Sequence, residues 1–460
     1  MDHMEFRNRL SGMRVLVVGL GKSGKAALDV LLDLGACVSV QDSASEDKMD
    51  PAFREKLREA GVTTFLGCKP EDMTAYDMLV LSPGVPPQLD FIEAARCSGA
   101  EIIGELELAY RLTPARFVAI TGTNGKTTTT TMVGEIFRKA GRNTSVVGNI
   151  GDPVVTAAEN AGEDDWMITE VSSFQLETTV CFKPVISAIL NLTPDHLNRH
   201  KTMEAYGNAK ARAAVNQDEN EYLVINFDDK TALPLAEQSR ATVIPFSRKE
   251  KLDVGAYVDN TSIIVKDLAG AEHYICDTHD LRIIGDHNIE NALAAAAIAY
   301  FAGIDPGVIG YAIKEFPGVE HRIEYSGSLD GVDYYNDSKG TNVDAAVIAV
   351  KALRDNIILI AGGDGKSQDF TELAAHFAGA VKALVLLGRD APQIEEAARR
   401  QGFTEIYNCR DMEDCVHTAA RIAQKGDKVL LSPACASWDM YANFEQRGRH
   451  FKQCVKDMIE

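Results

Sequence analysis

Short apolar runs that end in glycine or polar residues recur along the chain, and stretches with helical spacing of apolar residues separate them. Near the N-terminus these runs lie at residues 14–18, 38–40 and 78–81, and a helical stretch through residue 34 follows the first. Apolar runs of this length predict buried strands. Strands that alternate with helices predict a parallel, doubly wound sheet.

The middle of the chain repeats this alternation. Strands are predicted at residues 118–120, 166–169 and 185–192, and a helical stretch follows the first of them. An alanine-rich stretch at residues 287–301 predicts a helix that packs in the interior. Residues 249–280 carry no recognisable motif.

A third series begins after a Pro-Gly pair at residues 317–318. Further strands are predicted at residues 334–336, 357–361, 383–387 and 429–431. Each is followed by a loop with glycine, hydroxyl or charged residues, which is typical of the ligand-binding edge of an open α/β sheet. Turn chemistry explains any one of these loops. The four together favour a second doubly wound sheet with a ligand edge.

The length of 460 residues exceeds what a single core usually supports. We therefore expect an α/β protein of three domains, at residues 1–104, 105–317 and 318–460. The first and third are predicted as Rossmann-like doubly wound sheets. They flank a central mononucleotide-binding domain of the phosphate-loop type.

The net charge of −20 argues against broad binding to nucleic acid or to anionic membranes, because both need a basic surface. No apolar run reaches the length of a membrane span, and no signal sequence is apparent, so a cytoplasmic protein is expected. The nine cysteines show no Cys-x-x-Cys pair. They predict reduced, buried thiols without disulfides or a zinc site. We expect a monomer.

The strongest chemical motif follows the strand at 118–120, where Gly-x-x-Gly-Lys-Thr opens a helix. Backbone N–H groups and the helix N-terminus of such a loop converge on phosphates, the lysine adds charge, and the hydroxyl can ligate Mg²⁺. The spacing is two residues shorter than the general phosphate-loop pattern, and an ordinary strand–turn–helix corner is the alternative. The predicted nucleotide-binding residues are Gly122, Thr123, Asn124, Gly125, Lys126, Thr127 and Thr128.

A second glycine motif, Gly-x-Gly-x-x-Gly at residues 19–24, follows the first strand, and Asp42 ends the next one. This arrangement is typical of NAD-dependent oxidoreductases. It also fits another nucleotide that carries a diphosphate on the helix N-terminus. The rigid turn at residues 82–87 ends a further strand, where ligands bind in such sheets.

Four further residues fall where a nucleotide site needs polar groups. Glu170 ends the strand at 166–169, from which a carboxylate can reach a Mg²⁺ held by the phosphate loop. His196 follows the next strand, and either a metal or phosphate role or a simple cap explains it. Asn288 and Asn291 share a helix face. They can offer amide groups to a purine, although helix packing also accounts for that segment.

These motifs together resemble the Mur ligases, the enzymes that add amino acids to the UDP-muramyl precursor of peptidoglycan. The likeness rests on the segments at residues 121–127, 170–176, 195–196, 287–291, 321–322, 337–342, 362–366 and 432–448. It spans essentially the whole chain. The ATP motifs are shared with folylpolyglutamate synthases, whereas the C-terminal motifs look like those of the members that add D-glutamate.

The resemblance implies a ligase in which ATP phosphorylates the carboxylate of UDP-MurNAc-L-Ala and the amine of D-glutamate attacks the acyl phosphate. It implies ATP and two Mg²⁺ ions as cofactors. The implied metal ligands are Thr127, Glu170, His196 and a carbamylated Lys210. Sequence alone would place Lys210 on the surface of a helix. The implied catalytic residues are Lys126, His196, Lys210 and Lys339.

The resemblance also assigns the substrate sites. Asn288 and Asn291 would face adenine, with Arg322, Asp337 and Lys339 near the nucleotide. The UDP substrate would be held by Gly21, Lys22, Ser23, Asp42, Ser82, Gly84, Asn149 and His196. The residues implied for D-glutamate are Thr341, Lys366, Ser437 and Phe444. A dianionic amino acid needs a cation and converging donors, which suits this set.

Three alternative functions fit part of these motifs. Another Mur-type or folylpolyglutamate-type ligase would keep the ATP chemistry with a different amino acid. An NAD-dependent dehydrogenase leaves Lys126 and Glu170 without a role. A nucleotide-binding module without catalysis does not explain the loops that carry Lys366 and Ser437.

Overall fold

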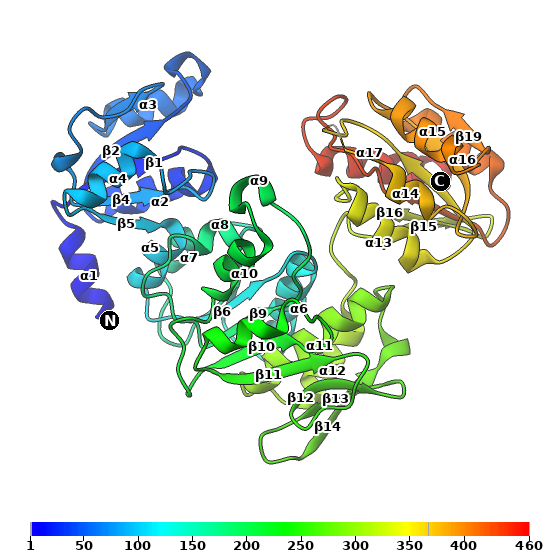
Figure 1. Cartoon of the computed structure of the whole chain (residues 1–460), viewed down its shortest axis with the longest axis horizontal. Helices are drawn as coiled ribbons and strands as arrows, with labels where there is room; N and C mark the ends of the chain where they lie inside the picture. Colours follow the sequence, from blue (N-terminus) through cyan, green and yellow to red (C-terminus); the bar gives the residue numbers. More distant parts are fainter. Residues whose placement is uncertain (1, 367, 460) are drawn as a thin grey trace. The chain divides into compact units, whose positions relative to one another are not determined.

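The computed structural model describes residues 2–366 and 368–459, and within them the strands form three sheets (Figure 1). The chain divides into two compact units. Unit 1 runs to Leu281 and includes Ile289–Phe316. Unit 2 comprises Arg282–Asn288 and the chain from Pro317 onward. The three sheets agree with the predicted α/β class, whereas the exact domain boundaries remain a prediction.

The first sheet, in unit 1, is parallel throughout and has the order β3-β2-β1-β4-β5. Its strands are β1 (Arg14–Val18), β2 (Cys37–Asp42), β3 (Thr63–Leu66), β4 (Met78–Leu81) and β5 (Glu101–Gly104). The helices of this part are α1 (His3–Leu10), α2 (Lys22–Asp33), α3 (Pro51–Glu59) and α4 (Asp90–Cys97). The observed order is that of a doubly wound sheet, with the first crossover at the glycine motif.

The second sheet has the order β14-β13-β12-β11-β10-β9-β6-β8-β7. It is parallel from β7 to β12, and β13 and β14 continue it as antiparallel strands. Its strands are β6 (Arg116–Thr121), β7 (Thr144–Gly148), β8 (Trp166–Glu170), β9 (Ile186–Ile189), β10 (Tyr222–Asn226), β11 (Thr242–Ser247), β12 (Gly255–Asp259), β13 (Ser262–Lys266) and β14 (Glu272–Asp277). The stretch at 249–280 that lacked a motif thus forms this antiparallel edge.

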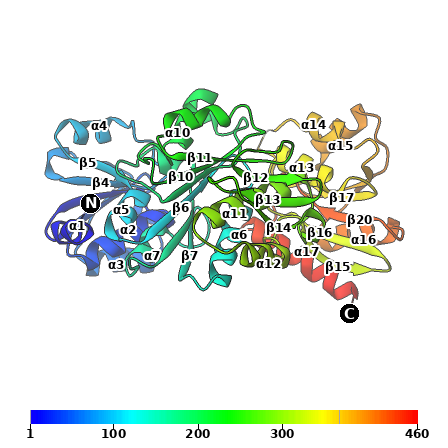
Figure 2. The same ribbon diagram turned by 90° about the horizontal axis from the view of Figure 1, so that it is seen from below.

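Helices cover both faces of the second sheet. Figure 2 shows α10 on one face, and α11 and α12 on the other. The helices are α5 (Glu105–Leu112), α6 (Lys126–Lys139), α7 (Val154–Ala158), α8 (Ser173–Leu176), α9 (Leu197–His200), α10 (Met203–Ala211), α11 (Asp286–Phe301) and α12 (Pro306–Glu315). Both α5 and α2 pack against α7, so the glycine motif and the second sheet belong to one packed body.

The third sheet, in unit 2, has the order β15-β16-β20-β17-β18-β19. Its strands are β15 (Glu324–Leu329), β16 (Val332–Asn336), β17 (Ile357–Ala361), β18 (Val381–Leu386), β19 (Ile406–Asn408) and β20 (Lys428–Leu431). The helices are α13 (Val343–Leu353), α14 (Thr371–Ala375), α15 (Ala391–Arg400), α16 (Met412–Ile422) and α17 (Phe444–Ile459). The prediction of a parallel sheet was incomplete, because β15 pairs antiparallel with β16.

Buried apolar strands form the cores. All five residues of β17 and the apolar residues 117–120 of β6 are buried, as expected for strands covered on both faces. Within the described residues, no helix is long and apolar enough to cross a membrane. The nine cysteines are free thiols, but the prediction that they are buried was wrong for Cys37, Cys68, Cys97 and Cys181, which are exposed.

Candidate active site

The phosphate loop joins β6 to α6, as its motif predicts. Gly125 adopts a φ of +82°, and a Cβ atom there would lie 2.3 Å from Asn291 Oδ1. Both its conformation and its close contact with α11 therefore require glycine. Asn191 holds the loop from the next strand end, accepting from Asn124 N at 2.8 Å and donating to Asn124 O at 3.0 Å. Sequence analysis had not singled out Asn191.

Two lysines converge on one carbonyl of this loop. Lys126 Nζ donates to Gly122 O at 2.9 Å and to Thr123 O at 2.8 Å. Lys210 Nζ donates to Gly122 O at 2.8 Å. Thr127 and Thr128, in the first turn of α6, are buried beside them.

The surface position expected for Lys210 from sequence alone is wrong, because its side chain is buried at 1% exposure. Burial holds the pKa of Lys210 well below its usual value, and the positive charge of Lys126 lowers that pKa further. The ammonium form is thereby disfavoured. The Tyr206 ring, one turn earlier in α10, lies 4.5 Å from Lys210 Nζ.

Glu170 ends β8 beside the phosphate loop and is 2% exposed. Its Oε1 accepts from Asn149 Nδ2 at 2.8 Å, so residues predicted for the metal and for the UDP substrate meet here. Its Oε2 is buried and has no hydrogen-bond partner within the described part of the chain. A buried carboxylate oxygen without a donor suits a divalent cation, because the metal would compensate the cost of burial.

His196 follows β9, at the same edge of the second sheet as Glu170. It adopts a left-handed backbone with φ of 53°, and its ring lies 4.9 Å from the ring of Phe174. Partial burial lowers the pKa of His196, and Asp195 opposes that effect. The neutral imidazole can act as a metal ligand.

Two residues predicted for the UDP substrate form hydrogen bonds with the glycine motif of the first sheet. Asp42 Oδ2 accepts from Leu20 N at 2.6 Å, and Ser82 Oγ donates to Gly19 O at 2.7 Å. Gly21 caps α2, and Ser23 lies in its first turn. Lys22 donates to Gly151 O and lies 3.5 Å from Asp152 Oδ1, so it joins the loop that carries Asn149.

Arg199 in α9 is a residue that sequence reasoning missed. Its guanidinium donates to Gly84 O and Val85 O, each at 3.1 Å, and pairs with Glu177 at 2.5 Å. It thereby fixes the turn at 82–87, which contains the predicted Gly84. The Asp-His pair at residues 195–196, just before α9, was the only motif near Arg199 in the sequence.

Beyond the phosphate loop, five residues are predicted near the nucleotide, and four of them belong to unit 2: Asn288, Arg322, Asp337 and Lys339. Asn288 and Arg322 line a small pocket of about 170 Å³, together with Pro317, Tyr325 and Tyr335. Asn288 Nδ2 also donates to Ile284 O at 2.7 Å. Asn291 belongs to unit 1, where its Oδ1 accepts from Thr129 Oγ1 at 3.2 Å.

Asp337 and Lys339 lie in the loop after β16. Burial raises the pKa of Asp337 to about 7, although Ser432 Oγ donates to its Oδ2 at 2.7 Å. Lys339 Nζ lies 5.6 Å from the ring of Phe444 at the start of α17. Phe444 O accepts from Ser338 Oγ at 2.8 Å, so that carbonyl is already used within the protein.

Arg447, buried in α17, joins this loop to the one after β20. It donates to Ser338 O at 2.8 Å, to Ser338 Oγ at 3.0 Å and to Cys435 O at 3.0 Å. Burial lowers the pKa of Arg447 to about 10. Arg447 lies within a matched motif, but its role as a link between loops depends on tertiary contacts.

The residues predicted for the amino acid lie on the loops of this sheet edge. Lys366 is exposed, with Nζ 4.5 Å from the ring of Trp438, while the neighbouring Ser437 is buried. Thr341 follows Lys339 and donates its N–H to Lys339 O at 2.9 Å. The loops of Lys366 and Ser437 lie side by side, because Asp364 and Ala436 pair through their backbones.

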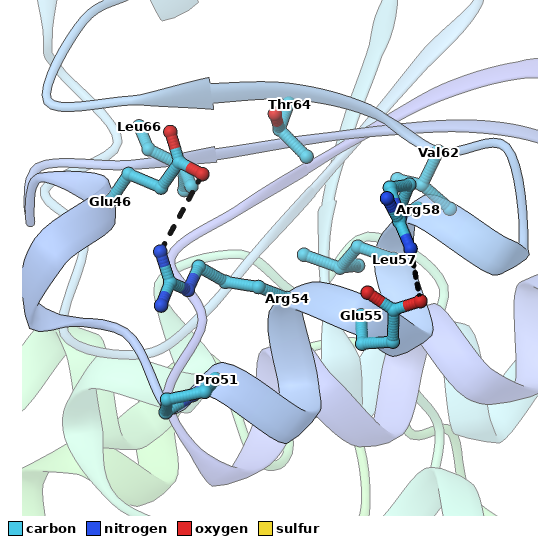
Figure 3. A pocket seen from close by; sticks show the side chains of 9 residues that line it. All are labelled: Glu46, Pro51, Arg54, Glu55, Leu57, Arg58, Val62, Thr64 and Leu66. Carbon is cyan, nitrogen blue, oxygen red and sulfur yellow. Dashed lines mark hydrogen bonds and ion pairs between the residues drawn. The ribbon is translucent and has the colours of Figure 1, made fainter.

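Two other features resemble binding sites. A hollow of about 540 Å³ beside α3 contains two ion pairs, Arg54–Glu46 and Arg58–Glu55, and none of the predicted site residues (Figure 3).

Glu320, His321 and Glu324 bring possible metal-ligand atoms together. However, Lys452 Nζ lies 3.0 Å from Glu320 and 2.6 Å from Glu324, so an ammonium already supplies the positive charge.

Comparison with known proteins defines the class of this fold and site. The Mur ligase middle domain matches residues 120–299, the Mur ligase glutamate ligase domain 321–435, and the MurD-like N-terminal domain of Mur ligases 13–104. The chain belongs to the Mur ligase family.

Within that family, the chain is similar to UDP-N-acetylmuramoylalanine--D-glutamate ligases. It is 46% identical over 452 residues to that of Caldanaerobacter subterraneus subsp. tengcongensis, covering 98% of this chain and 99% of the relative. It is 47% identical over 450 residues to that of Clostridioides difficile, with the same coverage.

Solved structures support the fold. The UDP-N-acetylmuramate-alanine ligase of Thermotoga maritima aligns with a TM-score of 0.59 at 18% identity, covering 97% of this chain and 100% of that one.

Proposed function

We propose that the chain is an ATP-dependent ligase that adds D-glutamate to UDP-N-acetylmuramoyl-L-alanine in peptidoglycan precursor synthesis. The observation that carries this proposal is 46–47% identity, over nearly the full length of both chains, to ligases of that name. The proposal includes a cytoplasmic monomer with domains at residues 1–104, 105–317 and 318–460.

The ATP triphosphate would lie on the phosphate loop and the N-terminus of α6. The N–H groups of residues 122–128 would donate to phosphate oxygens, and Lys126 would add its charge. Thr127, Glu170 and His196 would hold Mg²⁺, a placement supported by the unpartnered Oε2 of Glu170. The bound metal neutralises phosphate charge as it develops during transfer.

Lys210 would complete the metal site as a carbamate. Its burial and its position beside Lys126 support this proposal, because a second ammonium is disfavoured there. A neutral amine can take up CO₂, which converts the side chain into an anion. An anionic ligand suits a site that holds two divalent cations.

The UDP substrate would lie along the glycine motif of the first sheet. Its diphosphate would face the N-terminus of α2 at Gly21, Lys22 and Ser23, since a helix N-terminus favours anions. Asp42, Ser82 and Gly84 would act from the neighbouring strand ends. Asn149 and His196 would then connect this substrate with the metal site, consistent with the contact between Asn149 and Glu170.

The reacting carboxylate of UDP-MurNAc-L-Ala would accept the γ-phosphoryl group, and ADP would leave. The D-glutamate amine would attack the resulting acyl phosphate and release phosphate. Lys366, Thr341, Ser437 and the segment at Phe444 would bind D-glutamate. Arg322, Asp337 and Lys339 would act beside the nucleotide, with Lys339 as a catalytic cation, and Asn288 and Asn291 would serve the adenine side.

The test is phosphate release from ATP and Mg²⁺ with UDP-MurNAc-L-Ala and one amino acid at a time. We expect turnover with D-glutamate and none with L-glutamate, L-alanine or a diamino acid. Turnover with another amino acid alone would replace D-glutamate with that acceptor. Turnover without the UDP substrate would contradict the ligase assignment.

A further inference from the structure

Trp438 is an exposed aromatic residue in the loop that follows β20. Its exposed fraction is 64%, the largest among the exposed tyrosine and tryptophan side chains of the described chain. The only other tryptophan, Trp166, is 3% exposed in the core of the second sheet. The surface of Trp438 is therefore available to contact a charged group or a ligand.

The face of Trp438 is directed at a cation. Lys366 Nζ lies 4.5 Å from the centre of the indole ring, within the range of a cation–π contact. Lys366 itself has a left-handed backbone with φ of 51°. Its N–H donates to Asp364 Oδ1 at 3.1 Å, which holds this turn of the loop.

Backbone hydrogen bonds hold these two side chains on adjoining loops. Asp364 N donates to Ala436 O at 2.9 Å, and Ala436 N donates to Asp364 O at 2.8 Å. Further along, Asp439 Oδ2 accepts from Arg389 N at 2.8 Å. The separation between Lys366 and Trp438 is thus set by two short loops that are paired to each other.

We propose that Trp438 is a positioning residue of the amino-acid site: it orients the Lys366 ammonium toward the carboxylate of the incoming amino acid. This inference rests on the proposed function. The indole face attracts the ammonium without neutralising it, in contrast to a carboxylate partner. Lys366 therefore keeps its full charge for the substrate, and its flexible side chain loses less freedom when the carboxylate binds.

Binding also changes the surroundings of Trp438. A carboxylate that pairs with Lys366 lies next to the indole ring and shields it from water. Because the chain has two tryptophans, the Trp166→Phe variant leaves Trp438 as the single fluorescent indole. Its emission then reports on this site directly.

The first measurement titrates D-glutamate into Trp166→Phe protein that holds UDP-MurNAc-L-Ala and a non-hydrolysable ATP analogue. We expect the emission of Trp438 to shift and its quenching by acrylamide to fall as D-glutamate binds. L-Alanine serves as the control ligand, because it lacks the second carboxylate.

The second measurement compares Trp438→Leu, Trp438→Phe and, as a control from the same loop, Met440→Leu. Met440 is also exposed. In Trp438→Leu the KM for D-glutamate should rise about two- to fivefold, the size expected for a cation–π contact between exposed side chains. The KM for ATP should stay unchanged. Trp438→Phe, which keeps an aromatic face, should recover part of the loss.

The outcomes separate this inference from the proposed function. Normal turnover with D-glutamate, combined with unchanged emission and an unchanged KM in Trp438→Leu, overturns the positioning role alone. An equal loss in Trp438→Phe and Trp438→Leu also overturns it, since the aromatic face would not matter. Absence of D-glutamate turnover in wild-type and Trp166→Phe protein overturns both proposals.

Discussion

The side chains at the phosphate loop differ in how far sequence could predict them. Lys126 and Thr127 were predictable because local spacing alone places them at the start of a helix. The burial of Lys210 was not, because α10 has no clear apolar stripe and its neighbours come from the distant phosphate loop. Resemblance to a family singled out Lys210, and only tertiary structure shows its burial.

The proposed carbamate makes a prediction for Lys210. Lys210→Ala should lower kcat about 100-fold or more, the effect of removing one charged group that stabilises a transition state. Added bicarbonate should not restore activity in this variant. In wild-type protein, carbon-13 bicarbonate should produce a carbamate resonance that is absent from Lys210→Ala.

The exposed Lys201→Ala variant is the control for this experiment, since Lys201 lies near α10 but on the surface. Near-normal turnover of Lys210→Ala would remove the carbamate from the account.

Glu105, at the start of α5, makes a prediction about pH. Burial raises the pKa of Glu105 to about 7, while Oε1 accepts from Val155 N at 2.7 Å and Oε2 has no partner in the described structure. Its contribution to stability is present below pH about 4.5 and is lost as pH rises through about 7. Glu105→Gln keeps the acceptor and removes this dependence.

We therefore expect Glu105→Gln to gain stability over wild type as pH rises from 5 to 8, by about 2–3 kcal/mol at the upper end. Thermal midpoints measured at several pH values test this, with the exposed Glu163→Gln as control. A constant difference between variant and wild type across that range would refute the role of Glu105.

At the scale of elements, apolar runs and glycine motifs predicted ten of the twenty strands of the described residues, and these ten lie in parallel pairs. Among the strands that escaped prediction are β12 to β14, which no chemical motif marks and which pair antiparallel with one another. They pack as an edge on the second sheet. Similarly, β15 contains Gly327 and an irregular register against β16, which obscures the alternation expected of a strand.

The contact between the phosphate loop and α11 makes a prediction for Gly125. Gly125→Ala should lose most phosphate release and destabilise the fold by about 2 kcal/mol or more. The added Cβ would clash with Asn291, and alanine would also have to adopt the unfavourable φ of this position.

Gly141→Ala is the matched control. Gly141 ends α6 with φ of +73° and has open space around its Cβ position. Gly141→Ala should lower the free energy of unfolding by about 1 kcal/mol and keep its activity, since only the backbone conformation is affected. Equal losses in the two variants, measured by thermal unfolding and phosphate release, would contradict the role of the Asn291 contact.

At the scale of the whole molecule, three sheets divide the chemistry between two units. Unit 1 contains the phosphate loop, Glu170, Lys210 and the glycine motif, and unit 2 contains Asp337, Lys339, Lys366 and Ser437. Sequence predicted three domains rather than these two units, although it assigned the same motifs to separate groups because each group follows its own series of strands. It could not predict links such as Arg447 and Arg199, which join loops that are distant along the chain.

The measurement that tests the central claim most directly follows oxygen from substrate to phosphate. UDP-MurNAc-L-Ala labelled with oxygen-18 in its carboxylate is incubated with ATP, Mg²⁺ and D-glutamate, and the products are analysed by mass spectrometry. We predict that the released phosphate carries one labelled oxygen for each D-glutamate joined, because the acyl phosphate takes that oxygen from the substrate. Unlabelled phosphate accompanying D-glutamate addition would contradict an acyl-phosphate intermediate.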